Sequence, residues 1–150
     1  MTREEIERME SGRELDALIA EKVMKLDVRK SESWVGDLTA LGYPGQKVTF
    51  IGEFTEEREW VEEGDYFWKD DEGASHVLPD YSTDIGAAWQ VVEKIKDGIF
   101  SIFWKNNPGV DGWTIALDPT DSDSGSYSVF GETFPLAICR AALLACEMTK

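Results

Sequence analysis

The chain contains one histidine, His76, and two cysteines, so the side chains that commonly serve as base and nucleophile are few. A histidine acts as a general base only when a nucleophile or substrate lies within hydrogen-bond reach. No serine stands in a Gly-x-Ser-x-Gly turn, and Cys139 falls on the apolar face of a predicted helix. We therefore interpret His76 as a polar residue at a hairpin edge, expect no catalytic residue, and predict a protein that is not an enzyme.

The two cysteines, Cys139 and Cys146, lie seven positions apart in one predicted helix. Helical rise places their Cα atoms about 10.5 Å apart. A disulfide needs Cα atoms within about 7 Å of each other, so these two residues cannot bridge. We predict reduced thiols, which agrees with a cytosolic protein.

Two acidic segments have some features of metal sites. The segment from Asp121 to Glu132 carries carboxylates at positions 1, 3 and 12 of a calcium loop, but its position 6 is Ser126, where that loop needs glycine. In Asp70-Asp71-Glu72, three adjacent side chains of a turn point in different directions instead of converging. We interpret both segments as solvated loops and predict no metal and no cofactor, with calcium at 121–132 left as an open alternative.

Residues suited to a small ligand occur at two predicted helix starts and among the aromatic residues. Backbone N–H groups at the start of a helix can hold an anion such as a phosphate. Aromatic rings outside the helices can stack on a flat ligand such as a nucleobase. The predicted ligand-binding residues are Tyr81, Ser82, Thr83, Asp84, Thr133, Arg140 and Trp68.

Helical patterns position these residues. A central helix is predicted to begin after Ser82-Thr83-Asp84, and its apolar face is predicted to be Ile85, Ala88, Trp89, Val92 and Ile95. Near the N-terminus, Thr2 with Glu5 and Ser11 with Glu14 each have the form of a capping box, and an amphipathic helix runs to about Lys25. A last helix is predicted from about Thr133.

Strand patterns occupy the remainder of the chain. Residues 27–46 predict a long loop or a short strand around Trp34-Val35, followed by a strand over 48–51. Residues 65–78 predict a hairpin with an acidic turn. Three candidate strands over 99–105, 113–117 and 127–130 are joined by connections too short for crossovers, which predicts an antiparallel meander.

Composition limits the class of protein. With 150 residues, 42% of them hydrophobic, the chain suits one globular domain. Thirty acidic against fifteen basic residues give a net charge of −15, which repels phosphates and argues against a nucleic-acid binder. We explain the charge by solubility; a DNA mimic is an alternative that needs the charge along one elongated face. No apolar run approaches the roughly 18–20 residues that span a bilayer, and no signal peptide is evident.

Three segments also resemble a known family. They are Gly12 to Met24, Pro79-Asp80-Tyr81-Ser82-Thr83-Asp84-Ile85 continuing to Lys94, and Thr133-Phe134-Pro135-Leu136-Ala137 continuing to Leu144. Together they are similar to the phage ABA sandwich domain family, small proteins of phages and prophages of Gram-positive bacteria. The resemblance implies an α/β/α sandwich in the cytoplasm of an infected bacterial cell and supplies no catalytic residue. Residues 27–76 form a variable insert relative to the family.

From these observations we predict one α+β domain over residues 1–150, with a mainly antiparallel sheet flanked by the N-terminal, central and C-terminal helices. The predicted function is that of a non-enzymatic phage accessory protein that counteracts host defence by binding and sequestering a nucleotide-type signal. The alternative is an acidic protein-interaction module or DNA mimic that binds a host or phage protein. A homo-oligomer is left open.

Overall fold

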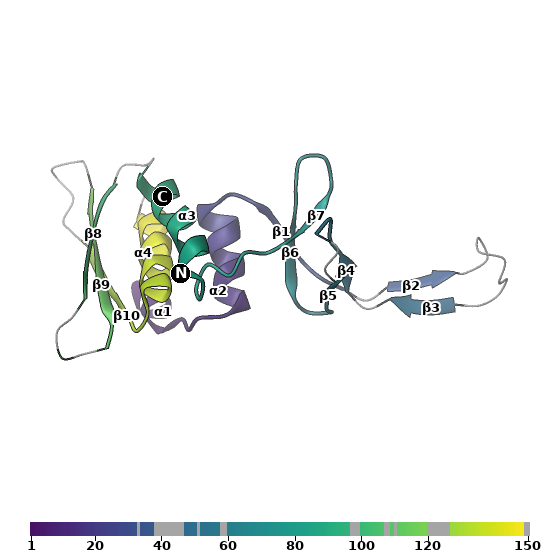
Figure 1. Ribbon diagram of the computed structural model, residues 1–150, viewed down its shortest axis with the longest axis horizontal. Coiled ribbons are helices and arrows are strands. Elements are labelled where there is room, and N and C mark those ends of the chain that lie inside the picture. The colour runs from purple at the N-terminus through teal and green to yellow at the C-terminus, as the bar shows by residue number, and fades with distance from the viewer. Residues whose placement is uncertain are drawn as a thin grey trace. The chain divides into compact units, whose positions relative to one another are not determined.

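The computed structural model describes residues 1–32, 34–37, 47–50, 52–57, 60–96, 100–106, 109, 111–119 and 127–148. The chain divides into two compact units (Figure 1). Unit 1 comprises Met1–Lys25 and Pro79–Lys150, and unit 2 comprises Leu26–Leu78. All the helices of the described part belong to unit 1.

Unit 1 begins with two short helices. In α1 (Arg3–Arg8), the Thr2 hydroxyl accepts the Glu5 N–H while the Glu5 side chain accepts the Thr2 N–H, so the first predicted capping box is confirmed. The second is wrong: α2 (Arg13–Leu18) has Gly12 at its N-cap, without a side-chain cap. The Gly12 N–H is bound from outside the helix, by the Ser82 hydroxyl at 3.0 Å. A π-helical turn, η1 (Ile19–Val23), follows directly.

The central helix is α3 (Ile85–Lys96), capped by Asp84, whose carboxylate accepts the Ala87 N–H. Its buried residues are Ala87, Ala88, Val91, Val92 and Ile95. The predicted apolar face is therefore wrong at two positions, since Ile85 is 63% exposed and Trp89 is 42% exposed. Because the helix packs on α4 (Phe134–Met148), the stripe through Ala88, Val91 and Ile95 turns inward.

The helix α4 is the most enclosed element of unit 1. Apart from Arg140, every residue from Phe134 to Ala145 is buried. A helix that is apolar all round is typical of an element surrounded by others. It packs against α1, α3 and η1 and against two strands of the sheet (Figure 1).

The sheet of unit 1 is the predicted antiparallel meander. The strands β8 (Phe100–Asn106), β9 (Trp113–Pro119) and β10 (Tyr127–Gly131) lie in the order β10-β9-β8. Alternation sends Ile115, Leu117 and Val129 into the core. The opposite face carries the exposed rings of Phe103 and Phe130, and the helices of the described part lie on one side of this sheet (Figure 1).

Unit 2 consists of short antiparallel strands. The sheet β1 (Asp27–Lys30), β6 (Tyr66–Lys69) and β7 (Ser75–Val77) has the order β1-β6-β7 and contains the predicted hairpin. Two further pairs are β2 (Trp34–Asp37) with β3 (Lys47–Phe50), and β4 (Glu53–Phe54) with β5 (Trp60–Val61). The strand predicted around residues 34–35 is confirmed; of the strand predicted over 48–51, residues 48–50 are confirmed and residue 51 lies outside the described residues. The prediction for 27–30 missed β1, because that strand exists through long-range pairing with β6.

The fold class is thus α+β with antiparallel sheets. Cys139 is buried, Cys146 is half-buried and both are free, as predicted. Among the described residues, no helix combines the length and apolar content that a bilayer crossing requires. Of the acidic segment 121–132, residues 121–126 lie outside the described residues.

Candidate functional site

The structure places the predicted ligand-binding residues in separate environments. Tyr81 is 1% exposed, and burial raises the pKa of its phenol to about 12. Ser82 is fully buried: its N–H donates to an Asp16 carboxylate oxygen at 2.7 Å, and its hydroxyl accepts the Gly12 N–H. Ser82 therefore connects the segment before α3 to the start of α2, and neither Tyr81 nor Ser82 faces solvent.

At the two helix starts, side chains of the protein itself already bind backbone N–H groups. Asp84 accepts the Ala87 N–H at 2.8 Å, and Thr133 accepts the Leu136 N–H at 3.3 Å. The backbone N–H of exposed Thr83 donates to the Asp80 carbonyl. An anion at either start would have to compete with these internal acceptors.

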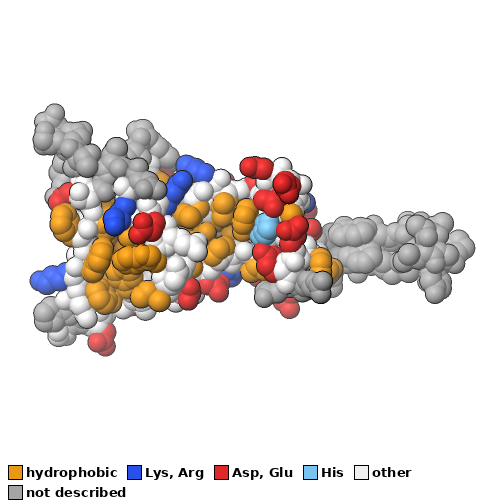
Figure 2. All heavy atoms as spheres, turned by 45° about the horizontal axis from the view of Figure 1, so that its top comes forward, with side chains coloured by type: hydrophobic (Ala, Val, Ile, Leu, Met, Phe, Trp, Pro, Cys, Tyr) orange, Lys and Arg blue, Asp and Glu red, His pale blue; other side chains and the backbone are white. Residues whose placement is uncertain are grey.

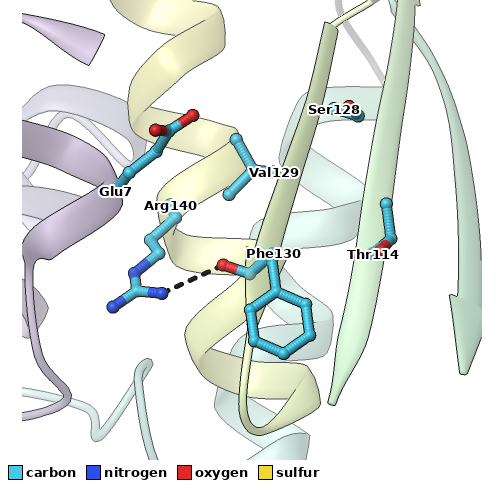
Figure 3. A pocket seen from close by; sticks show the side chains of 6 residues that line it. All are labelled: Glu7, Thr114, Ser128, Val129, Phe130 and Arg140. Carbon is cyan, nitrogen blue, oxygen red and sulfur yellow. Dashed lines mark hydrogen bonds between the residues drawn. The ribbon is translucent and has the colours of Figure 1, made fainter. Parts of the chain in front are cut away.

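Arg140 is the predicted residue that lines a cavity. An open cavity of about 330 Å³ lies beside the free edge of β10 (Figure 3). Figure 3 shows the Arg140 side chain reaching from α4 to the edge of that strand, with the Phe130 ring on the other side of the strand backbone. The lining residues are Glu7, Thr114, Ser128, Val129, Phe130 and Arg140.

Two arginines bind the outward-facing carbonyls of β10. Arg140 Nη1 donates to the Phe130 carbonyl at 3.0 Å, and Arg3 Nη2 donates to the Ser128 carbonyl at 2.9 Å. Arg140 Nε and Nη2 both donate to the Met9 carbonyl. These contacts close a strand edge that would otherwise be free to pair with another strand. Three of the five Arg140 N–H groups are used in this way within the described residues, and two remain for another acceptor.

The remaining predicted residue, Trp68, lies in unit 2 and stacks on His76, with ring centroids 4.5 Å apart. Both nitrogens of that imidazole meet carboxylates: Nδ1 lies 2.9 Å from Glu57 Oε1 and Nε2 lies 2.7 Å from Asp70 Oδ2. Figure 2 shows the single histidine surrounded by acidic side chains on the visible face of unit 2. The hydrogen bonds with Asp70 and then Glu57 raise the pKa of His76, and the same bond with His76 lowers the pKa of Asp70.

The sequence interpretation named His76, Asp70 and Trp68 of the group in unit 2 but missed Glu57, and of the residues around the cavity at β10 it named only Arg140. Thr114, Ser128 and Phe130 are ordinary strand residues, and only the pairing of β9 with β10 makes Thr114 the neighbour of Phe130. Glu57 is 19 positions from His76 and reaches it only after the chain folds back. No local spacing signal marks Glu57 or the residues around the cavity, since strand pairing, helix packing and turns bring them together.

Comparison with known proteins then assigns the family. The model of the phage ABA sandwich domain matches residues 17–143. The chain belongs to the phage ABA sandwich domain family. The match includes all of the segment from Pro79 to Lys94 and most of the two segments at Gly12 to Met24 and Thr133 to Leu144, from which the resemblance was inferred. The protein is therefore a phage protein of this family.

A solved structure supports the fold of this ABA sandwich protein. The fold of this chain is similar to the 2.0 Å crystal structure of a phage protein from Bacillus cereus ATCC 14579, with a TM-score of 0.58 and 20% sequence identity. The alignment covers 93% of this chain and 94% of the other. No curated protein sequence matches the chain.

Proposed function

We propose that this phage protein acts by binding, and that its ligand is a small nucleotide-type molecule held in the cavity beside β10. The observation that carries the proposal is the set of residues that line that cavity around the edge of β10: Arg140 on one side of the strand, and Phe130, Ser128 and Thr114 on the strands themselves. A nucleotide presents complementary groups: a phosphate for the guanidinium, a flat base for the ring and ribose hydroxyls for the small polar side chains.

The size of the cavity and the exposure of the ring support this ligand class. A volume of about 330 Å³ falls at the lower end of the range of small-molecule sites. The Phe130 ring is 39% exposed, and it is held in place over Gly112, where an added Cβ would lie 2.2 Å from the ring. A ring fixed in this way loses little freedom when a base stacks on it.

Charge limits the affinity. Glu7 also lines the cavity, and the whole chain carries −15, so a phosphate must gain more from Arg140 than it loses to the surrounding field. Binding is therefore expected to favour ligands with few negative charges, such as cyclic nucleotides and ADP-ribose derivatives. Sequestration of such a signal would remove it from a host defence pathway, which is the role we propose for the protein in the infected cell.

The proposal is of a binding protein and not of an enzyme, because the reactive side chains of the described residues are poorly placed for catalysis. Both ring nitrogens of His76 are engaged by carboxylates, and burial raises the pKa of the Cys139 thiol well above its ordinary value. Neither group is placed beside the cavity at β10. A binding protein needs neither of them.

Replacing Phe130 with alanine should weaken ligand binding about five-fold or more, because loss of one base–aromatic stack costs roughly 1–3 kcal/mol. The measurement is calorimetric titration of the full chain with a panel of cyclic nucleotides and ADP-ribose derivatives, before and after the substitution. Phe103→Ala is the matched control. The Phe103 side chain lies on the same face of the sheet and is 57% exposed, but it does not line the cavity. No binding across the panel, or equal losses in both variants, would refute the proposal.

A second candidate function is favoured by a different observation. Trp89 on α3 and Trp104 on β8 are 42% and 46% exposed, pack edge to face at 5.9 Å, and both contact the Phe134 ring. Exposed, mutually braced tryptophans are typical anchors of protein interfaces. They support the acidic protein-interaction module as the alternative function.

Such a module should no longer bind its protein partner when Trp89 is replaced. We expect Trp89→Ala to abolish co-purification of any protein captured from infected cells, with Phe103→Ala retaining it. Quantitative mass spectrometry of the captured fraction measures both. A capture that weakens steeply with salt but not with Trp89→Ala would indicate the acidic surface instead and would support a DNA mimic.

A further inference from the structure

Three side chains of unit 2 bring potential metal ligands together at the β6–β7 hairpin. Glu56, Asp70 and His76 each offer one ligand atom, and these atoms lie within 4.8 Å of one another. Measured from His76 Nε2, Asp70 Oδ2 is 2.7 Å away and Glu56 Oε2 is 4.0 Å away. An ion at about 2.0–2.2 Å from each ligand needs donor atoms about 3–3.5 Å apart, a separation bracketed by these two distances. We propose that Glu56, Asp70 and His76 bind one divalent transition-metal ion.

The surroundings of His76 match those of a metal-ligating imidazole. Such a histidine almost always donates its other ring N–H to a carboxylate or carbonyl, which fixes the tautomer and the ring orientation. Here Nδ1 lies 2.9 Å from Glu57 Oε1, so Nε2 is the nitrogen directed at the other two carboxylates. The Trp68 ring stacks against the imidazole and restrains its rotation.

The backbone holds the Asp70 carboxylate and the main chain of Glu56 in place. Asp70 Oδ1 accepts the N–H groups of Glu72 and Ala74 at 3.0 and 2.9 Å, which leaves Oδ2 for His76 and for the ion. The Glu56 N–H donates to the Ser75 carbonyl at 2.8 Å, directly before His76 in the chain. The Glu56 side chain is 64% exposed, so it can move the short distance that coordination requires.

The charge and donor types indicate which ions fit. Three carboxylates surround a single imidazole, so their negative charge exceeds the single positive charge of a protonated ring. The two positive charges of a divalent ion balance more of that negative charge. One imidazole with two carboxylates suits zinc or manganese, while magnesium and calcium prefer oxygen ligands alone. A water molecule would complete the coordination, and any proton on Nε2 would leave to solvent when the ion binds.

The test uses the full, untagged chain, freed of metal with a chelator, so that His76 is the only histidine. Titration with zinc chloride should show saturable binding of one ion per chain. His76→Gln and Asp70→Asn should each weaken it about 100-fold, and Glu57→Gln, which removes only the supporting carboxylate, about ten-fold. Glu72→Gln removes one negative charge from the same turn without removing a ligand and should leave the affinity within about two-fold.

A second measurement does not depend on how the variants fold. With manganese chloride added to the unsubstituted chain, the single set of imidazole resonances should broaden before the signals of unit 1 do. Resonances of His76 that remain sharp at saturating manganese would overturn the proposal, as would zinc affinity that is equal in Glu72→Gln, His76→Gln and Asp70→Asn. Zinc bound by the thiols instead would persist in His76→Gln and would count against the site.

Discussion

Gly131→Ala is expected to lower the free energy of unfolding by about 3 kcal/mol, because no space exists for even one methyl group at this position. A Cβ there would lie 2.5 Å from the Ala137 nitrogen, 2.6 Å from its Cα and 2.8 Å from its Cβ. Gly131 ends β10 and Ala137 lies in the first turns of α4, so the strand rests directly on the helix backbone. The new methyl must push apart the sheet and the most enclosed helix of unit 1.

Urea unfolding followed by the far-ultraviolet helical signal measures this effect, since the described helices all belong to unit 1. Ser128→Ala, at an exposed position of the same strand, is the control and should change the unfolding free energy by less than about 0.5 kcal/mol. Adding Ala137→Gly should not rescue Gly131→Ala, because two of the three close atoms belong to the backbone. A stable Gly131→Ala protein would contradict this packing.

Asp16→Ala is expected to lower the free energy of unfolding by about 2–3 kcal/mol, because it leaves the buried Ser82 N–H without its acceptor. Asp16 is 1% exposed, and its Oδ1 accepts that N–H at 2.7 Å. Its other oxygen lies 3.6 Å from Arg13 Nη1. Asp16→Asn keeps an oxygen acceptor of the same shape, so it should retain most of the stability that Asp16→Ala loses.

The charge of Asp16 adds a pH dependence of definite sign. Desolvation raises the pKa of this carboxyl above its ordinary 3.8, although the hydrogen bonds from Ser82 act in the opposite direction. The folded state therefore holds the proton more tightly than the unfolded state, so this contribution to stability is complete below about pH 3.8 and is lost as the pH rises through the raised pKa. Asp16→Asn should lack this component and gain stability relative to the unsubstituted chain over that interval.

Urea unfolding of both proteins at a series of pH values from about 3 upward measures the difference. Glu14→Gln, on the exposed face of the same helix, should give a curve parallel to that of the unsubstituted protein. If Asp16→Asn instead lost stability relative to the unsubstituted chain as the pH rose, the buried charge would be stabilising and our account of Asp16 would be wrong.

The roles of Asp16 and Gly131 could not be predicted from sequence, whereas the neighbouring helix signals could. Thr2 with Glu5 forms its capping box because every atom involved lies within four residues, and backbone geometry alone brings them together. Ser11 with Glu14 has the same pattern, yet Gly12 starts the helix, and its N–H binds Ser82, 70 positions away. A local rule does not account for such a distant partner.

Periodicity likewise identified α3 and three of its buried residues, Ala88, Val92 and Ile95, but placed the buried stripe wrongly at two other positions. Ile85 and Trp89 satisfy the helical spacing, and both are exposed because the direction of the buried stripe depends on where α4 lies. The family was recognisable from the segments around Pro79 and Thr133, which match a model covering residues 17–143. Family membership established the class of protein but assigned no ligand residue.

The short-range features of this protein were predictable from sequence alone: the capping box at Thr2, the cap of α3 at Asp84, the meander of β8 to β10, the hairpin around the acidic turn and the free state of the thiols. Which side chains meet, by contrast, follows from the tertiary fold. Arg140 reaches the edge of β10 from a helix, and Glu57 reaches His76 across 19 positions. The physical reason is that backbone preferences act over a few residues, whereas a site forms from side chains that strand pairing and helix packing bring together.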